Sequence, residues 1–114
     1  MYYIYMVRCA DDSIYTGIAA DLGRRLRQHV QKDPAAAKYT RSRAVAALEA
    51  AWTAPDRSAA SRMENAVKRL PRAKKLLLIA DGSQLPALLP QLKAEDYTRL
   101  PALPLESYLK GETP

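Results

Sequence analysis

YIYMVRCADDSIYTGIAADLGRRLRQH, residues 3–29, is the stretch of sequence that decides the fold. It begins with aromatic, aliphatic and thiol residues, passes through Asp11-Asp12-Ser13, and returns to strand-forming residues at 14–18. Aspartates and serine favour turns, whereas aromatic and β-branched residues favour strands. Asp21 then offers an N-cap for a helix. The pattern predicts a β-hairpin that leads into a helix.

The tyrosines give this hairpin chemical interest. Side chains alternate between the two faces of a strand. A loop with an odd number of residues, such as 10–12, places Tyr15 opposite Val7 and diagonal to Tyr5, roughly 7–8 Å away. A two-residue loop would put the two phenols on opposite faces. Gly17 lacks a side chain and is expected to leave this face open to a ligand.

The helix adds two further polar groups. Leu22, Leu26 and Val30 are spaced four residues apart and predict an apolar stripe against the sheet. Arg25 and His29 share one edge of that stripe, because they too are four residues apart. The sequence therefore predicts that two phenols, a guanidinium and an imidazole meet where the hairpin joins the helix.

This set of residues resembles the GIY-YIG nuclease domain in its small stand-alone bacterial form. The likeness rests on Tyr3-Ile4-Tyr5, on Tyr15-Thr16-Gly17, and on the spacing to Arg25 and His29. It extends over about residues 2–80. Tyr3 stands where the family has its first glycine, and Thr16 replaces an isoleucine of the second motif.

The rest of the chain supplies further elements of an α/β (α+β) fold. Residues 45–53 predict a third strand, and Asp56 or Ser58 caps a helix that ends at Leu70. Pro71 opens another helix, which Gly82 ends. We expect a small three-stranded antiparallel sheet flanked by helices. Residues 1–82 form the nuclease-like domain in this interpretation, and residues 83–114 form a Pro-rich, acidic C-terminal extension.

Glu64 interrupts an apolar stripe. Ala60, Met63 and Val67 have the spacing of a buried helix face, and Glu64 falls among them. A carboxylate at such a position is costly unless a cation or a metal satisfies it. An ion pair with Lys68, four residues later, is the simpler interpretation. The resemblance implies instead that Glu64 is the one protein ligand of a divalent metal.

Composition sets the wider bounds. A chain of 114 residues with one cysteine fits a single domain in a reducing compartment, and it lacks a signal or membrane segment, so a cytoplasmic protein is expected. The net charge is +6; residues 1–80 carry 15 Lys and Arg against 7 Asp and Glu, and residues 81–114 carry 3 against 5. Such a basic domain attracts polyanions, although a solvated cationic face is an equal alternative.

Nucleic acid is the predicted partner. Residues 38–43, KYTRSR, combine cations and hydroxyls that suit phosphates with a tyrosine that suits base stacking. The full set of expected nucleic-acid contacts is Arg24, Arg27, Lys38, Tyr39, Arg41, Arg43 and Lys68. The acidic extension is a candidate for covering the sheet or for self-association.

The resemblance implies a divalent-metal-dependent DNA endonuclease with Tyr5, Tyr15, Arg25, His29 and Glu64 as catalytic residues. In this scheme Glu64 holds Mg²⁺ or Mn²⁺, Arg25 binds the phosphate, and Tyr5 accepts a proton from the attacking water. Because a phenol is a weak base at neutral pH, positive charge is expected to lower the pKa of Tyr5. Single-stranded or branched DNA is the expected substrate, in DNA processing, repair or uptake. The alternatives are a non-catalytic nucleic-acid-binding module and an interaction protein that acts through its C-terminal tail.

Overall fold

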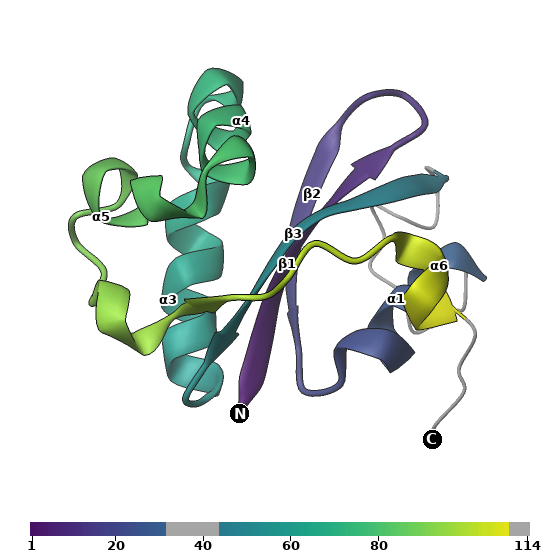
Figure 1. The fold of residues 1–114 in the computed structure, drawn as a ribbon, viewed down its shortest axis with the longest axis horizontal. Coiled ribbons are helices and arrows are strands. Elements are labelled where there is room, and N and C mark those ends of the chain that lie inside the picture. Colours follow the sequence, from purple (N-terminus) through teal and green to yellow (C-terminus); the bar gives the residue numbers. More distant parts are fainter. Residues whose placement is uncertain (32–43, 110–114) are drawn as a thin grey trace.

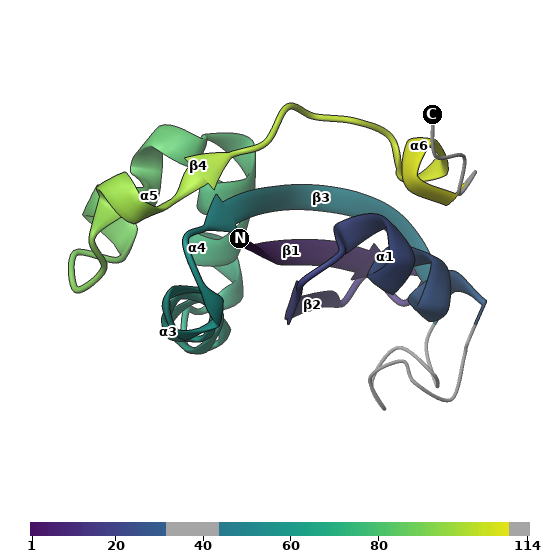
Figure 2. The same cartoon turned by 90° about the horizontal axis from the view of Figure 1, so that it is seen from below.

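The computed structural model describes residues 1–31 and 44–109. Its strands form one antiparallel sheet in the order β2-β1-β3-β4. Helices cover both faces of this sheet, with α1 and α6 on one side and α3, α4 and α5 on the other (Figures 1 and 2). The elements in chain order are β1 Tyr2–Cys9, β2 Ile14–Ala19, α1 Leu22–Val30, β3 Val45–Ala54, α3 Arg57–Lys68, α4 Arg72–Ala80, η1 Gly82–Gln84, α5 Leu85–Leu88, η2 Ala94–Asp96, β4 Thr98–Arg99 and α6 Leu105–Leu109.

Of the two loop parities considered from the sequence, the hairpin has the odd one. Val7 lies opposite Tyr15, and the N–H of Cys9 donates to the carbonyl of Ser13 at 2.9 Å, which leaves a three-residue loop. Asp12 closes this loop with a φ of 70°. Three-residue hairpin loops commonly end on a residue in this left-handed conformation, and Asp tolerates it better than most residues. The register predicted for the two tyrosine-bearing strands is therefore confirmed.

The sheet has four strands rather than the three expected from sequence. Thr98–Arg99 pairs with β3, and Arg99 lies opposite Trp52. The hydroxyl of Tyr97 donates to the carbonyl of Ala59 at 2.7 Å, and the guanidinium of Arg99 lies 4.9 Å from the centre of the Trp52 ring. A strand of two residues has no periodicity that a sequence pattern can reveal. Packing against α3 and β3, and not local propensity, creates it.

Two buried clusters lie on the two faces of the sheet. The cluster on the α3 side includes Ile4, Met6, Trp52, Met63, Leu78 and Tyr97. The cluster on the α1 side includes Tyr5, Val7, Leu22, Leu26 and Leu105. The C-terminal extension thus contributes Tyr97 to one cluster and Leu105 to the other. The division of the chain at residue 82 stays a prediction.

The apolar stripe of α1 differs from the predicted one at its last member. Val30 is 36% exposed, whereas His29 is 1% exposed. In an α-helix, the seventh residue after Leu22 returns closer to its direction than the eighth does. His29 therefore points at the sheet and Val30 turns away from it.

Helices α3 and α4 begin at their predicted signals, and α3 ends at Lys68, two residues before the predicted Leu70. The carboxylate of Asp56 accepts from the N–H of Ala59 at 2.8 Å and caps α3, and α4 begins directly after Pro71. In α4, Leu78 is buried but Leu77 is exposed, so residues 76–79 are only partly core. In the described residues, no helix has the length and apolar character needed to cross a membrane.

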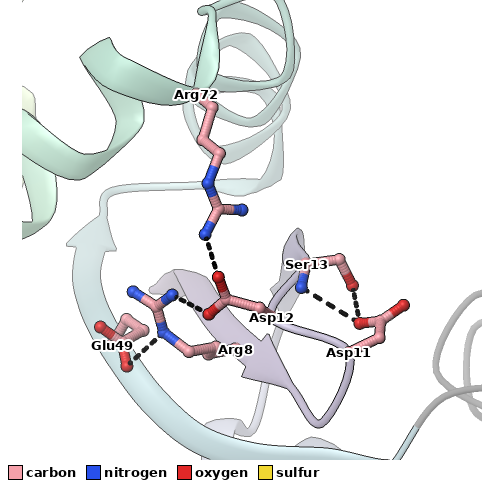
Figure 3. Close-up of polar contacts among 6 residues, drawn as sticks. All are labelled: Arg8, Asp11, Asp12, Ser13, Glu49 and Arg72. Carbon is pink, nitrogen blue, oxygen red and sulfur yellow. Dashed lines mark hydrogen bonds and ion pairs between the residues drawn. The ribbon is translucent and has the colours of Figure 1, made fainter.

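A set of ion pairs joins the hairpin tip to α4 (Figure 3). The carboxylate of Asp12 lies 2.6 Å from Arg8 and 3.0 Å from Arg72, and Arg8 also reaches Glu49 at 3.4 Å. At the loop, the N–H and the hydroxyl of Ser13 both donate to the same carboxylate oxygen of Asp11. Because Asp12 is solvent-exposed, these contacts orient the loop more than they stabilise the fold.

Candidate active site

Three aromatic rings from three elements meet beneath α1. Tyr5 comes from the central strand β1, Tyr15 from the edge strand β2, and His29 from the last turn of α1. The Tyr5 hydroxyl lies 2.6 Å from Nε2 of His29. The ring centres are 6.4 Å apart for the two tyrosines, 5.5 Å for Tyr5 and His29, and 5.8 Å for Tyr15 and His29. The structure thus brings together three of the five residues that the sequence analysis assigned to catalysis.

Gly17 makes this cluster possible in a way the sequence did not suggest. It lies opposite Tyr5 in the hairpin, and a Cβ atom at this position would lie 2.5 Å from the Tyr5 hydroxyl oxygen and 2.7 Å from Cζ. The phenol of Tyr5 therefore fills the space above Gly17. The expectation that Gly17 leaves this face open to a ligand is wrong, because the space is needed to hold the catalytic candidate itself.

Arg25 lies at the border of the ring cluster. Its Nη1 donates to Oε1 of Gln28 at 3.1 Å, one turn further along α1. Its positive charge acts to lower the pKa of Tyr5, Tyr15 and His29, so it is close enough to affect all three rings. For the two tyrosines this effect is smaller than that of burial. A guanidinium in this position is suited to bind an anion that approaches the phenols.

Burial controls the protonation of the three rings. Burial raises the pKa of Tyr5 well above its ordinary value, and the neighbouring Tyr15 raises it further, against a smaller opposite effect of Arg25. Arg25 by itself therefore does not produce the expected lowering of the Tyr5 pKa, because desolvation outweighs its positive charge. Burial, and then the negative charge of Glu64, raises the pKa of Tyr15. Burial and the charge of Arg25 lower the pKa of His29 to about 4.

All three rings are consequently neutral at neutral pH. With His29 in the tautomer that carries its proton on Nδ1, the Tyr5 hydroxyl donates to Nε2. The buried phenol of Tyr5 is therefore protonated before any reaction begins. It can accept a proton from a water molecule only as it passes its own proton to His29.

Glu64 approaches the cluster from α3. Its charge raises the pKa of Tyr15, and its Oε2 lies 3.3 Å from Nζ of Lys68. The Lys68 ammonium also lies 5.6 Å from the centre of the Tyr15 ring. The ion pair expected as the simpler interpretation of Glu64 is therefore present, and it sits beside the tyrosines.

The donor set at Glu64 suits one class of metal ion. The described residues contain no group of three or more His, Cys, Asp and Glu side chains placed to hold a metal. Mg²⁺ does not need such a group, since it keeps several waters and commonly binds one or two carboxylates together with substrate phosphates. The partly exposed carboxylate of Glu64, at a ring cluster that the Arg25 charge also reaches, fits that requirement. For Glu64 to bind the ion, its ion pair with Lys68 would have to break.

The residues expected to contact nucleic acid fall in different places. Arg24 is exposed on α1, whereas Nη1 of Arg27 donates to the carbonyl of Tyr108 at 3.1 Å and so is engaged with α6. Lys68 lies at the ring cluster. The remaining four, Lys38, Tyr39, Arg41 and Arg43, lie outside the described residues, and their contacts stay predictions.

A cleft of about 350 Å³ is lined in part by Arg25, the residue at the border of the ring cluster. Its polar lining comes mainly from Arg24, Arg25 and Gln28 on α1 and from Arg57 at the start of α3. Gln28 and Arg57 were not among the site residues predicted from the sequence. Their spacing could have identified them, because Gln28 follows Arg25 by three residues and Arg57 precedes Glu64 by seven.

Comparison with known proteins agrees with the resemblance seen in the sequence. The family model described as the GIY-YIG catalytic domain matches residues 1–76. A UPF0213 protein of Halalkalibacterium halodurans is 40% identical over 79 residues, which is 69% of this chain and 82% of that protein. A UPF0213 protein of Citrobacter koseri is 37% identical over 92 residues, covering 81% of this chain and 90% of the relative.

One solved structure is also similar. It is the solution NMR structure of a UPF0213 protein from Bacillus halodurans, with 40% sequence identity. The match covers 70% of this chain and 84% of that one, with a TM-score of 0.45.

Proposed function

This chain belongs to the GIY-YIG catalytic domain family, a family of nucleases, and on that premise we propose that it is a divalent-metal-dependent DNA endonuclease that hydrolyses phosphodiester bonds. The observation that carries the proposal is the buried Tyr5–His29 hydrogen bond beside Tyr15, with the positive charge of Arg25 at its border. A structural role in packing would not require a phenol, an imidazole and a guanidinium to be grouped in this way.

Tyr5 and His29 act together as the proton acceptor in this proposal. The attacking water gives a proton to the Tyr5 hydroxyl oxygen while the phenol proton passes to Nε2 of His29, so no free phenolate forms. The raised pKa of Tyr5 favours this concerted transfer over a stepwise one, and the low pKa of His29 keeps its Nε2 unprotonated at neutral pH. Tyr15 orients the water or the phosphate from the diagonal position.

Arg25 and Glu64 supply the electrostatic part of catalysis. Arg25 donates to the non-bridging oxygens of the scissile phosphate, a task that suits its planar fork of N–H groups. Glu64 would hold Mg²⁺ or Mn²⁺. A bound ion of this kind neutralises charge that develops on the phosphate and on the leaving oxygen.

The test is cleavage of labelled single-stranded, duplex and forked oligonucleotides with Mg²⁺ or Mn²⁺. Glu64→Ala and Tyr5→Phe should each lower the cleavage rate by at least about 100-fold. Glu49→Ala is a matched control: the Glu49 side chain is 21% exposed and that of Glu64 19% exposed, and each is paired with one cation. The proposal fails if the parent protein shows no metal-dependent cleavage, or if Glu49→Ala reduces cleavage as much as Glu64→Ala.

A second candidate is a nucleic-acid-binding module of the same fold without turnover. The 3.3 Å ion pair between Glu64 and Lys68 favours it, because a carboxylate held by a lysine is not available to a metal. Binding of the same oligonucleotides without cleavage, together with tighter or unchanged binding in Glu64→Ala, would establish this alternative.

Single-stranded or branched DNA is the substrate that we propose, in DNA processing, repair or uptake. Support comes from the basic character of residues 1–80 and from Tyr39 within the cationic segment 38–43, since an aromatic ring among cations suits an unpaired base. We also propose a cytoplasmic location, which agrees with Cys9 being the single cysteine of the sequence, so that no internal disulfide can form. Self-association through residues 83–114 remains a proposal for which oligomeric state in solution is the test.

A further inference from the structure

The cleft that Arg25 shares with the ring cluster has more positive than negative side chains in its lining. Three arginines line it, Arg24 and Arg25 from α1 and Arg57 from α3, against one acidic residue, Asp21. Asp21 is already used, since its carboxylate accepts from the N–H of Arg24 as the cap of α1. Within the described residues, the guanidinium groups of Arg24 and Arg57 are exposed and form no ion pair. Two exposed cations without an ion pair, Arg24 and Arg57, in the same cleft as Arg25 favour an anionic ligand.

The position of the cleft relates it to the ring cluster. Its floor includes Ile18 and Ala19, at the end of the edge strand β2. Helices α1 and α3 lie on either side of β2, on opposite faces of the sheet (Figure 2). The cleft therefore wraps around the sheet edge, and Arg25 belongs both to the cleft and to the border of the ring cluster.

One face of α3 continues the same path. Arg57, Ser61, Glu64 and Lys68 follow one another at intervals of four, three and four residues, which places them on a single helix face. Arg57 and Glu64 are separated by seven residues, or about 10 Å along the helix axis. A strand that runs along this helix face would therefore place different phosphates near Arg57 and near Glu64.

We propose that this cleft binds the phosphodiester backbone of the substrate strand beside the scissile phosphate. Arg57 and Arg24 donate to flanking phosphates from opposite walls, and Gln28 positions Arg25 through the 3.1 Å hydrogen bond. Arg57 is then a binding residue that sets where the strand lies across the edge of β2. This inference rests on the proposed function, because it takes a nucleic-acid strand as the ligand.

The experiment measures binding rather than turnover. A fluorescein-labelled single-stranded oligonucleotide is titrated with the full chain in EDTA, by fluorescence anisotropy, between 50 and 200 mM salt. Each phosphate contact to a single strand contributes about 0.7 to the slope of log K against log salt. Arg57→Ala should lower the magnitude of that slope by about 0.7. The ratio of parent affinity to variant affinity should therefore fall about 2.6-fold as the salt rises across this range.

Two variants make the result specific. Arg62→Ala removes the same charge from the same helix, but Arg62 is five residues after Arg57 and bonds to Ser58, so it points to a different face. We expect Arg62→Ala to keep the parent slope. Arg57→Lys keeps the charge and should recover most of the slope, which a loss of fold would not allow. Inorganic phosphate added at constant ionic strength should compete with the oligonucleotide for the parent more than for Arg57→Ala.

The outcomes separate this inference from the nuclease proposal. An Arg57→Ala slope equal to that of the parent, or an equal loss in Arg62→Ala, would overturn the cleft assignment even if the parent cleaves DNA. A change in phosphate competition without a change in oligonucleotide slope would also overturn it, because the cleft would then bind a free anion only. If the slope falls as expected while the parent cleaves nothing, the cleft assignment stands and the hydrolytic function fails.

Discussion

Replacing Gly17 with alanine tests the packing on which the site depends. The added Cβ would lie 2.5 Å from the hydroxyl oxygen and 2.7 Å from Cζ of Tyr5, and 3.0 Å from Cε2 of Tyr15. Carbon and oxygen atoms do not approach so closely, so the Tyr5 ring must move. The Tyr5 side chain is fully buried in the cluster on the α1 side of the sheet, and its hydroxyl is bonded to His29, so the ring has little room to move. Gly17→Ala should therefore break the Tyr5–His29 contact.

The cost can be estimated from two effects. Overpacking a filled core typically costs about 1–3 kcal/mol. Loss of the buried hydrogen bond between the Tyr5 hydroxyl and Nε2 of His29 adds a further cost of about 1–3 kcal/mol. Gly17 lies in a regular strand, where alanine would otherwise be the better residue. We expect Gly17→Ala to lower the free energy of unfolding by about 2–6 kcal/mol, measured by urea denaturation with an unchanged m value.

A matched substitution and a double variant isolate the cause. Gly23→Ala makes the same chemical change within α1, where the nearest atom is the flexible end of Arg27 at 3.1 Å. Because alanine is the better helix former, we expect Gly23→Ala to raise stability by about 0.5 kcal/mol. Combining Gly17→Ala with Tyr5→Phe removes the closest contact, so the two effects should be less than additive. A Gly17→Ala protein within about 0.5 kcal/mol of the parent, as is usual at neutral surface sites, would refute this account of the site.

Two further predictions concern buried polar groups. Thr16 is 2% exposed, and its hydroxyl finds no partner among the described residues; Thr16→Val should raise stability by about 1 kcal/mol in urea denaturation, whereas Thr16→Ser, which keeps the hydroxyl, should not. For His29, the folded pKa of about 4 lies below the ordinary value of about 6.5 in the unfolded chain. Stability from this residue is fully present above about pH 6.5 and should fall by up to about 3 kcal/mol as the pH drops to 4, and a His29→Gln protein that shows the same dependence would contradict this.

Local patterns were enough to predict much of the fold. The turn residues predicted the hairpin and left two loop lengths open; the three-residue loop in the structure places Tyr15 diagonal to Tyr5. Capping aspartates identified the starts of α1 and α3. These features depend on residues close together in the chain, where backbone geometry and side-chain spacing follow directly from residue type. The spacing of Arg25 and His29 likewise placed them on one edge of α1 before their partners were known.

The protonation, orientation and neighbours of those residues depended on packing between elements distant in sequence. The tertiary structure decided that Tyr5 is deep enough for burial to raise its pKa against the charge of Arg25, and that Gly17 makes room for its ring. It also decided that His29 and not Val30 faces the sheet, that a two-residue strand extends it, and that Arg57 shares a cleft with Arg24. Desolvation and distances between helices and strands depend on how the layers fit together, and no periodicity within one segment encodes them.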